Sequence, residues 1–553
     1  MRNKMKFLTL SLVALLMAFS VLSGCSKDSA GDNKGNTGDG SKNSGGKSEG
    51  FVLGEDELEY TMYGHYDWYT MPNWGEDAAS KWIKENKKVN VKSVSSGGNA
   101  AQKFNTMIVS NELPDVIWMD RGPDVEKLRE AGMLVPLDEY IEKYPNLKEW
   151  AGESTLNMLR SEDGHIYQFP NWYTTQPNGN SGYVVNDKIY KELGSPKLET
   201  TEDLYAFLKQ VKEKYPDIIP YEPGQGDGLD ILYSAFGEDH TTAFVGMRAV
   251  PQGDKLTSIF ADPVYRESML YVSKLFREKL ISQDALTQTA DQVKEKVMTG
   301  KFAVYAGSSP TVNSNLAHSL LKDQDPDAGL FMVWPFHKEG LDKNKIWTGS
   351  WSQLGWNVSV ITKAAKNPEA IFAFLDWYTG PEGQRHIFWG PEGLYWEGTH
   401  AVDGIAEAPV FTEKFVTDAT ERDKLMQATD PLQWAGNTVY IDKSKTAFEM
   451  TLPEEQQNWA TRYQSQITWK TQYNTTEYVN LSPMPDSEEG IIEQRVNDIY
   501  DEARAKSVHA KSDEEVIKIL DQAEKDAKSV GYEKLLEFKT KKWQENKAKM
   551  AGN

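Results

Sequence analysis

The fold is decided by the stretch from Leu58 to Met119, which holds Leu58-Glu-Tyr-Thr-Met-Tyr63, Val89-Asn-Val-Lys-Ser-Val94 and Asp115-Val-Ile-Trp-Met119. The first two segments alternate apolar and polar residues and the third is almost continuously apolar, which predicts three strands. Residues 76–86 and 100–110 place their apolar side chains on one face and are predicted helices. This β-α-β-α-β order predicts a parallel sheet with helices on both faces, an α/β fold.

Ligands of such sheets bind at the carboxyl ends of the strands. The segments that follow the three strands, residues 64–74, 95–99 and 120–121, are therefore candidate ligand loops. They contain four of our candidate ligand-binding residues, Trp68, Trp74, Asp120 and Arg121.

The N-terminus has the pattern of an export signal. Arg2, Lys4 and Lys6 precede an apolar run, residues 7–22, which is the order of a secretory signal peptide. The run is shorter than the ~20 residues of a transmembrane helix. Residues 26–50 are almost without apolar side chains and predict a flexible tether.

The apolar run ends in Leu22-Ser-Gly-Cys25, which resembles the bacterial lipobox. The resemblance implies removal of residues 1–24 as a signal peptide, lipid on the Cys25 thiol and an acyl chain such as palmitate on the new N-terminus. Two or more acyl chains suffice for stable anchoring. The alternative is an ordinary signal peptide with an incidental cysteine, although Cys25 is the only cysteine of the chain.

Composition narrows the possible functions. About 500 residues follow the tether, which predicts two or more domains. The formal net charge of −21 argues against binding of nucleic acid or anionic lipid. Many of the 17 Trp and 25 Tyr lie in Gly- and Pro-rich stretches, where flat rings can stack on the apolar face of a sugar. Candidate ligand-binding residues in such stretches are Trp172, Tyr173, Trp351 and Trp396.

A series of segments resembles bacterial extracellular solute-binding protein family 1, the substrate-binding lipoproteins of ABC transporters. The segments keep the family's order, although Val184 replaces the usual aromatic residue. They are Asn111–Val116, Ala131–Asp138, Asp163–Pro170, Gly182–Asp187, Val297–Tyr305 and Lys366–Tyr378.

The family resemblance implies a two-lobe, periplasmic-binding-protein-like type II fold with hinge crossings and a ligand between the lobes. From the matched segments we expect lobe one at residues 51–169 and 340–392. Lobe two is expected at residues 171–338 and 393–553, with a C-terminal helical extension.

The C-terminal third, with Gly393–Gly398, Leu452–Gln456 and the helical residues 513–547, resembles the larger LipO-like subgroup. That resemblance implies oligosaccharide ligands such as aldouronates. A uronate carboxylate would need a bidentate arginine, and Arg121 is the loop arginine best placed for it.

Motifs for other classes are missing. The sequence has no His-Glu-x-x-His, Gly-x-Ser-x-Gly or Walker loop, and Gly224-x-Gly226-x-Gly228 has the wrong spacing for a dinucleotide site. Asp323–Asp327 resembles the opening of a calcium loop, but Pro326 and Trp334 do not fit it, and we interpret it as a turn. We expect no catalytic residue, metal or cofactor.

The sequence therefore predicts a non-enzymatic, lipid-anchored solute-binding protein on the extracytoplasmic face of the cell membrane. Its expected partners are an oligosaccharide and ABC permease subunits; it is expected to be a monomer and not to bind nucleic acid. Two alternatives remain open, an extracellular glycoside hydrolase and a peptide-binding lipoprotein of the same fold.

Overall fold

The computed structural model describes residues 50–551, which lie within one compact unit. The predicted signal peptide, Cys25 and the tether up to residue 49 lie outside the described residues. Within residues 50–551, no helix combines the length and the apolar character needed to span a membrane.

Lobe one is built on a five-stranded sheet of order β2-β1-β3-β12-β4. The three predicted strands are confirmed to within one residue. These three strands pair in parallel, as predicted. The sheet as a whole is mixed, because β12 runs antiparallel to β3 and β4 and pairs Asn357 with Asp120. The strands are β1 (Leu58–Gly64), β2 (Val89–Val94), β3 (Val116–Asp120), β4 (Phe169–Asn171) and β12 (Asn357–Ile361).

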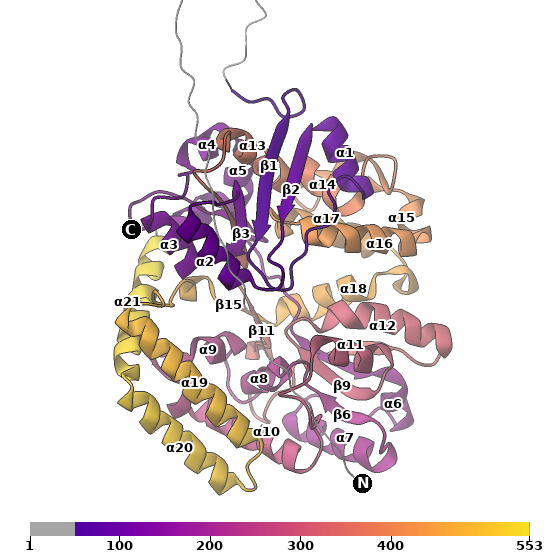
Figure 1. Ribbon diagram of the computed structural model, residues 1–553. Coiled ribbons are helices and arrows are strands. Elements are labelled where there is room, and N and C mark those ends of the chain that lie inside the picture. Colours follow the sequence, from indigo (N-terminus) through magenta and orange to yellow (C-terminus); the bar gives the residue numbers. More distant parts are fainter. Residues whose placement is uncertain (1–49, 552–553) are drawn as a thin grey trace, which may run out of the picture. The chain divides into compact units, whose positions relative to one another are not determined.

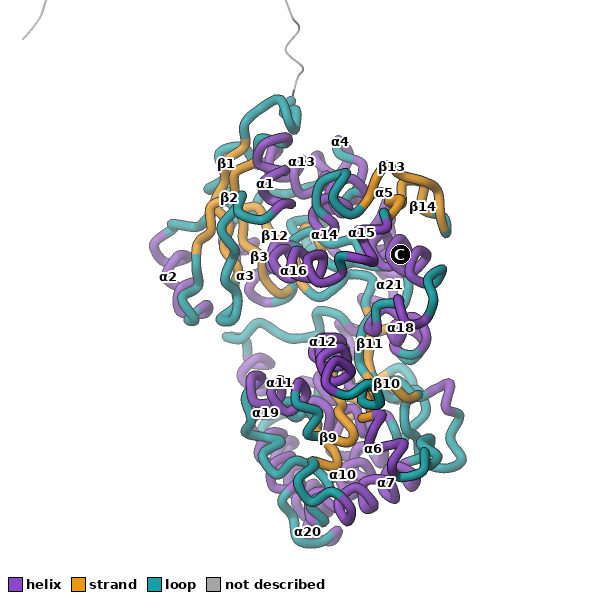
Figure 2. The backbone as a smooth tube through the Cα atoms, turned by 90° about the vertical axis from the view of Figure 1, so that its right-hand side faces the viewer, coloured by secondary structure: helices purple, strands orange, loops and turns teal. Residues whose placement is uncertain are grey.

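Helices cover both faces of this sheet, as predicted. Met62 of β1 belongs to the core that α1 (Ala78–Asn86) and α13 (Pro368–Thr379) share, whereas its neighbour Tyr63 packs with α2 (Ala100–Ser110) on the other face. The two helix groups lie on opposite sides of the strands in Figure 2. Lobe one also contains α3 (Pro123–Glu130), α4 (Asp138–Lys143), α5 (Pro145–Leu159), α14 (Pro381–Trp389), β13 (Trp396–Val402), β14 (Ile405–Phe411), α15 (Glu413–Thr417), α16 (Ala419–Thr429) and α17 (Thr438–Glu449).

The structure differs from the predicted lobe boundary at residue 393. Eleven residues between Tyr395 and Ile441 are buried in the core of lobe one, where Trp434 stacks on Tyr378 with 5.7 Å between ring centroids. The hairpin β13–β14 and helices α15–α17 cover the apolar faces of α13 and α14, which would otherwise meet water.

Lobe two is built on the sheet β10-β5-β9-β6, and Figure 1 shows it as a second group of elements below the first. Thr200 caps α7 and forms a capping box with Asp203. The elements of lobe two are β5 (Gly182–Asn186), α6 (Asp187–Glu192), α7 (Thr201–Lys214), β6 (Ile219–Glu222), α8 (Asp227–Ser234), α9 (Thr242–Met247), β7 (Ala249–Gln252), β8 (Lys255–Ser258), α10 (Pro263–Arg277), α11 (Ala290–Met298), β9 (Phe302–Gly307), α12 (Pro310–Gln324), β10 (Leu330–Val333) and α18 (Trp459–Gln466).

The predicted C-terminal helical extension is confirmed as three helices, α19 (Glu488–Val508), α20 (Asp513–Ser529) and α21 (Tyr532–Met550). Gly531, at φ +101°, separates the last two. The helices complete the core of lobe two, and Lys549 of α21 reaches the Arg160 carbonyl of lobe one at 3.0 Å.

The chain crosses between the lobes three times, from β4 to β5, from β10 to β12 and from α17 to α18. Two short parallel strands, β11 (Gly349–Trp351) and β15 (Gln472–Asn474), pair next to these crossings. Several crossings are the expected arrangement of a type II solute-binding fold.

Candidate functional site

Five rings gather at the carboxyl end of the lobe-one sheet, and we call them the aromatic cluster: Tyr66, Trp68, Tyr69, Trp118 and Trp356. The loop after β1 supplies the first three, β3 supplies Trp118, and Trp356 directly precedes β12. Ring centroids lie 4.9 Å apart for Tyr66 and Trp118, 5.0 Å for Tyr66 and Trp68, and 5.7 Å for Trp118 and Trp356. The antiparallel return of β12 is what brings Trp356 to this edge.

Two rings of the aromatic cluster are open to solvent. Trp68 is 65% exposed and Trp356 is 46% exposed, whereas Trp118 beneath them is buried. The buried Nε1 donor of Trp118 has no hydrogen-bond partner among the residues that the structure describes. Exposed tryptophans on a packed base provide flat apolar faces whose polar edges can donate hydrogen bonds.

Asp120 and Arg121 lie beside these rings. The Tyr66 hydroxyl donates to Asp120 Oδ1 at 2.8 Å, and burial together with the Asp120 charge raises the pKa of Tyr66. Arg121 Nη1 donates to the Leu354 carbonyl at 2.9 Å, and burial lowers the pKa of Arg121 to about 10, so it remains a cation at neutral pH. Asp120 itself is exposed and can accept hydrogen bonds from a ligand.

Two glycines allow the loops of the site to approach each other. A Cβ at Gly64 would lie 2.1 Å from Cδ1 of Tyr69, so only glycine lets that ring pack over the end of β1. Gly355, at φ +67°, directly precedes Trp356, and a Cβ there would lie 1.8 Å from the Asn171 carbonyl oxygen. Both close approaches fix the backbone that carries the exposed rings.

Of the eight predicted ligand residues, the structure brings Trp68, Asp120 and Arg121 together at this edge. Trp74 and Trp172 lie elsewhere in lobe one, packed against its core. Trp74 donates from Nε1 to the Val89 carbonyl at 2.8 Å, and its ring stacks on that of another core residue, Trp434.

Tyr173 and Trp396 are also core residues of lobe one. Tyr173 is fully buried, with its hydroxyl 2.9 Å from Thr379 Oγ1. Trp396 is 3% exposed and donates to the Gly390 carbonyl at 3.0 Å. Burial of these rings in the lobe-one core leaves them little surface for a ligand, so neither enters the site that we propose.

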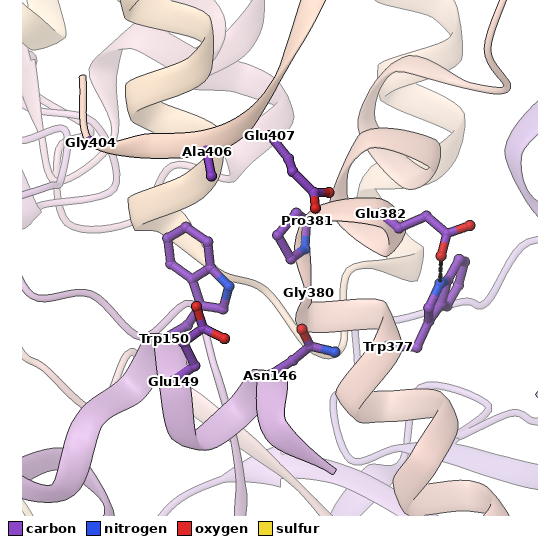
Figure 3. Close-up of a pocket in the computed structure, with 10 residues that line it drawn as sticks. All are labelled: Asn146, Glu149, Trp150, Trp377, Gly380, Pro381, Glu382, Gly404, Ala406 and Glu407. Atoms are coloured by element: carbon purple, nitrogen blue, oxygen red, sulfur yellow. Dashed lines mark hydrogen bonds between the residues drawn. The ribbon is translucent and has the colours of Figure 1, made fainter. Parts of the chain in front are cut away.

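Trp351 lies at the hinge, where it lines a pocket of about 390 Å³ together with Trp347 and Tyr473. A different pocket, of about 350 Å³, is shown in Figure 3 and lies on lobe one between α5, α14 and β14. It contains none of the predicted ligand residues, and one of its carboxylates, Glu382, accepts a hydrogen bond from Trp377 Nε1 at 2.6 Å.

Two residues of the aromatic cluster, Trp118 and Trp356, were not among the ligand residues predicted from the sequence. Trp118 was placed in a predicted strand, but strand alternation does not tell which side chain meets a ligand loop. Trp356 lies in an irregular stretch, and only the pairing of the next residue, Asn357, with Asp120 of β3 brings it to the site.

The structure shows no candidate metal centre among residues 50–551, where no group of three or more His, Cys, Asp or Glu side chains could hold an ion. The Asp323–Asp327 segment ends α12 and forms a turn, as interpreted from the sequence. Asp325 pairs with Lys188 at 2.7 Å.

Comparison with known proteins agrees with this architecture. FusA of Streptococcus pneumoniae serotype 4, a fructooligosaccharide ABC transporter substrate-binding protein, is 27% identical over 320 residues, 53% of this chain and 56% of FusA. Lipoprotein LipO of Bacillus subtilis strain 168 is 24% identical over 308 residues, 53% of this chain and 59% of LipO. The matches thus span little more than half the length of either relative.

Solved structures show the same fold. The structure of FusA in complex with kestose has a TM-score of 0.66 at 19% identity and covers 89% of this chain and 100% of that one. The structure of the alginate-binding protein AlgQ2 without calcium ion has a TM-score of 0.65 at 18% identity and covers 90% and 100%. The model of the bacterial extracellular solute-binding protein family matches residues 70–385, more than half of the chain. With two α/β lobes, several crossings and this match, the chain belongs to the bacterial extracellular solute-binding protein family.

Proposed function

We propose that this protein is the solute-binding component of an ABC importer and captures an oligosaccharide between its two lobes. The observation that carries the proposal is the aromatic cluster, in which Trp68 and Trp356 expose their rings beside the carboxylate of Asp120. A sugar presents an apolar C–H face, which can stack on the two rings, and a hydroxyl rim, which can donate hydrogen bonds to Asp120.

The names of the relatives support the same class of ligand. FusA is described as binding fructooligosaccharide, and YtcQ of Bacillus subtilis strain 168, 23% identical over 372 residues, as binding polygalacturonan and rhamnogalacturonan. Capture requires no covalent chemistry, so we propose that the protein is not an enzyme. Ligand contacts to both lobes would favour the closed arrangement of a hinge.

We also propose that Cys25 carries the lipid anchor that holds the protein at the extracytoplasmic face of the membrane. The proposal rests on the Leu22-Ser-Gly-Cys25 motif and on the absence of any other cysteine. A Cys25→Ser variant should leave the membrane fraction and appear in the culture medium, whereas Ser26→Ala should stay anchored. Retention of Cys25→Ser in the membrane fraction would contradict the anchor.

The binding proposal is tested by a thermal-shift screen of residues 26–553 against oligosaccharides and short peptides. We expect the unfolding temperature to rise with at least one oligosaccharide and with no peptide, because a ligand stabilises the state that it binds. A rise with peptides alone would reject the sugar proposal. Release of reducing sugar from the stabilising oligosaccharide would instead favour the glycoside hydrolase.

A further inference from the structure

One edge of the lobe-two sheet faces the connection to lobe one. It is formed by the carboxyl ends of the parallel strands β6 and β9, which end at Glu222 and Gly307. Gly307 pairs with Gly182, the first residue of β5 after the crossing from lobe one. The Ser181 hydroxyl donates to the Ser308 carbonyl at 3.3 Å. The segments after β6 and β9 therefore lie next to the crossing, where a ligand between the lobes would meet lobe two.

The segment after β6 is the glycine-rich loop Pro223-Gly-Gln-Gly226. Gly224 and Gly226 have φ values of +59° and +100°, which side chains with a Cβ rarely adopt. A Cβ at Gly228, the first helical glycine after the loop, would lie 2.5 Å from the Ala306 carbonyl oxygen of β9. The three glycines thus hold the loop tightly against the end of β9.

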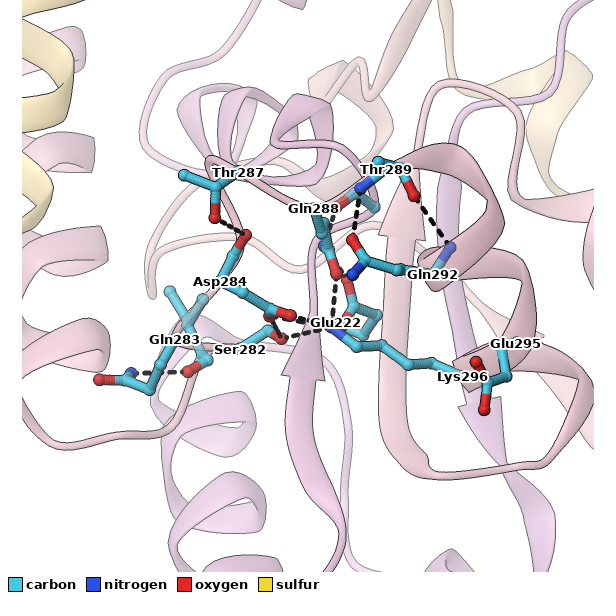
Figure 4. A network of polar contacts seen from close by, with 12 residues as sticks. Glu222, Ser282, Gln283, Asp284, Thr287, Gln288, Thr289, Gln292, Glu295 and Lys296 are labelled. Atoms are coloured by element: carbon cyan, nitrogen blue, oxygen red, sulfur yellow. Dashed lines mark hydrogen bonds and ion pairs between the residues drawn. The ribbon is translucent and has the colours of Figure 1, made fainter. Parts of the chain in front are cut away.

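A buried polar network holds one side of this loop, and Figure 4 shows it from close by. Gln288 donates to Glu222 Oε1 at 2.5 Å and also to the Gly224 carbonyl, and Lys296 Nζ lies 3.1 Å from Glu222 Oε2. The Glu222 side chain is fully buried, and burial raises its pKa. A buried ion pair is a weak source of stability, so its use here is better explained by the position that it gives to the loop.

The C-terminal extension holds the other side. Arg504 of α19 donates from Nη2 to the Gly226 carbonyl at 2.6 Å and to Asp230 Oδ1 at 2.9 Å. Asp227 accepts from the Ser308 backbone amide at 2.6 Å, which joins the loop to the segment after β9. The loop is therefore fixed from three directions, by Gln288 before α11, by Arg504 of α19 and by Ser308 after β9.

Only one residue of the loop points to solvent. Gln225 is exposed between two buried glycines, and Ser308 and Ser309 are exposed on the neighbouring segment. An amide and two hydroxyls can donate and accept hydrogen bonds, and none of them carries a charge. This set suits the hydroxyl rim of a sugar and offers no counter-charge to an acidic one.

The lobe-one side is no better suited to an acidic ligand. Arg121 donates from Nη1 to the Leu354 carbonyl, and its Nε is buried with no partner among residues 50–551. Lys103 of α2 donates to the Ser95 carbonyl at 2.6 Å. Two exposed carboxylates, those of Asp67 and Asp120, lie beside the aromatic cluster and would repel a uronate. A ligand carboxylate could therefore reach the Nε edge of Arg121 only if the side chain moved, so the bidentate contact expected from the sequence is not offered in this arrangement.

We infer that the ligand is a neutral, hydroxyl-rich oligosaccharide, and that Gln225, Ser308 and Ser309 form its contact on lobe two. This inference rests on the proposed function and narrows it to one class of glycan. Recognition by amide and hydroxyl groups on lobe two complements stacking on Trp68 and Trp356 on lobe one.

The first test compares calorimetric titrations of residues 26–553 with neutral and acidic oligosaccharides of equal length. Kestose, maltotriose, xylotriose and galactotriose form the neutral set, and trigalacturonate and a mannuronate trimer form the acidic set. We expect binding from the neutral set and at least ten-fold weaker binding from the acidic set. Equal or tighter binding of an acidic trimer would overturn the inference and leave the proposed function standing. Binding of no member of either set would count against both.

The second test uses Gln225→Ala with the trimer that binds best. We expect at least five-fold weaker binding and an unchanged unfolding temperature, because the side chain is exposed. Gln522→Ala, an exposed glutamine on α20 of the same lobe, serves as the matched control and should bind like the wild type. Unchanged affinity of Gln225→Ala would overturn the lobe-two placement, although the choice of a neutral ligand would stand.

Discussion

Replacing Trp68 by alanine should weaken sugar binding without unfolding the protein. A tryptophan presents up to about 250 Å² of surface, of which 65% is exposed here, or about 160 Å². A stacked sugar ring covers one face, about 80 Å², which at about 25 cal/mol per Å² is worth about 2 kcal/mol. Ordering of the ligand offsets part of this gain, so we expect a loss of about 1–2 kcal/mol, or about 5- to 30-fold in Kd.

Isothermal titration calorimetry of the wild type, Trp68→Ala and Trp68→Phe measures this loss directly. The phenylalanine variant keeps a smaller face and should fall between the other two. Val109→Ala removes another exposed apolar side chain of lobe one, 88% exposed on α2, and should bind like the wild type. A Kd for Trp68→Ala within two-fold of the wild type would refute the stacking role of this ring.

Three further predictions concern stability. Burial raises the pKa of Asp442 to about 6, so the folded protein keeps a proton that the unfolded chain releases at lower pH. The free energy of unfolding should therefore fall by about 1–2 kcal/mol between about pH 4 and pH 6. Thermal melts across that range should show that Asp442→Asn abolishes this slope. Gly64→Ala should lower the free energy of unfolding in urea by about 1–3 kcal/mol and weaken sugar binding, because the new Cβ would displace Tyr69. The control Gly246→Ala should be tolerated, since no atom lies within 4 Å of its Cβ. Trp543→Ala in α21 should cost about 3–5 kcal/mol, because the ring is 3% exposed; a loss below 1 kcal/mol would mean that the C-terminal helices contribute little to the core of lobe two.

Local patterns predicted the elements well. Alternation placed β1 and β2, and apolar spacing placed α2 at its observed bounds. These features depend on interactions between residues close in the chain. The periodicity of a segment shows that it has a face to bury, which is sufficient to recognise it as a strand or a helix.

Local patterns do not predict which strands pair when the strands are far apart in the sequence. Nothing in residues 357–361 indicates that β12 returns antiparallel beside β3, and the hairpin β13–β14 has no local mark that assigns it to lobe one. The positions of β12 and of the β13–β14 hairpin depend on which apolar surfaces of other elements they can cover.

The residues of the site likewise separate into those that the sequence predicted and those that only the three-dimensional structure reveals. The position of Trp68 after the first strand was sufficient to propose it, since ligand loops follow the carboxyl ends of strands. Trp356 joins Trp68 only through the pairing of β12 with β3. In contrast, Tyr173, in an irregular segment, and Trp396, at the start of β13, turn inward to the core. An aromatic residue in a loop has no sequence mark that distinguishes a solvent-facing ring from a buried one.

One titration tests whether the aromatic cluster binds an oligosaccharide. The sugar that gives the largest thermal shift is titrated into the wild type and into the Trp68→Ala, Trp356→Ala double variant, both lacking residues 1–25. We expect saturable binding to the wild type and at least about 25-fold weaker binding to a double variant that unfolds at a similar temperature. Equal affinities in the two proteins would contradict binding by the aromatic cluster.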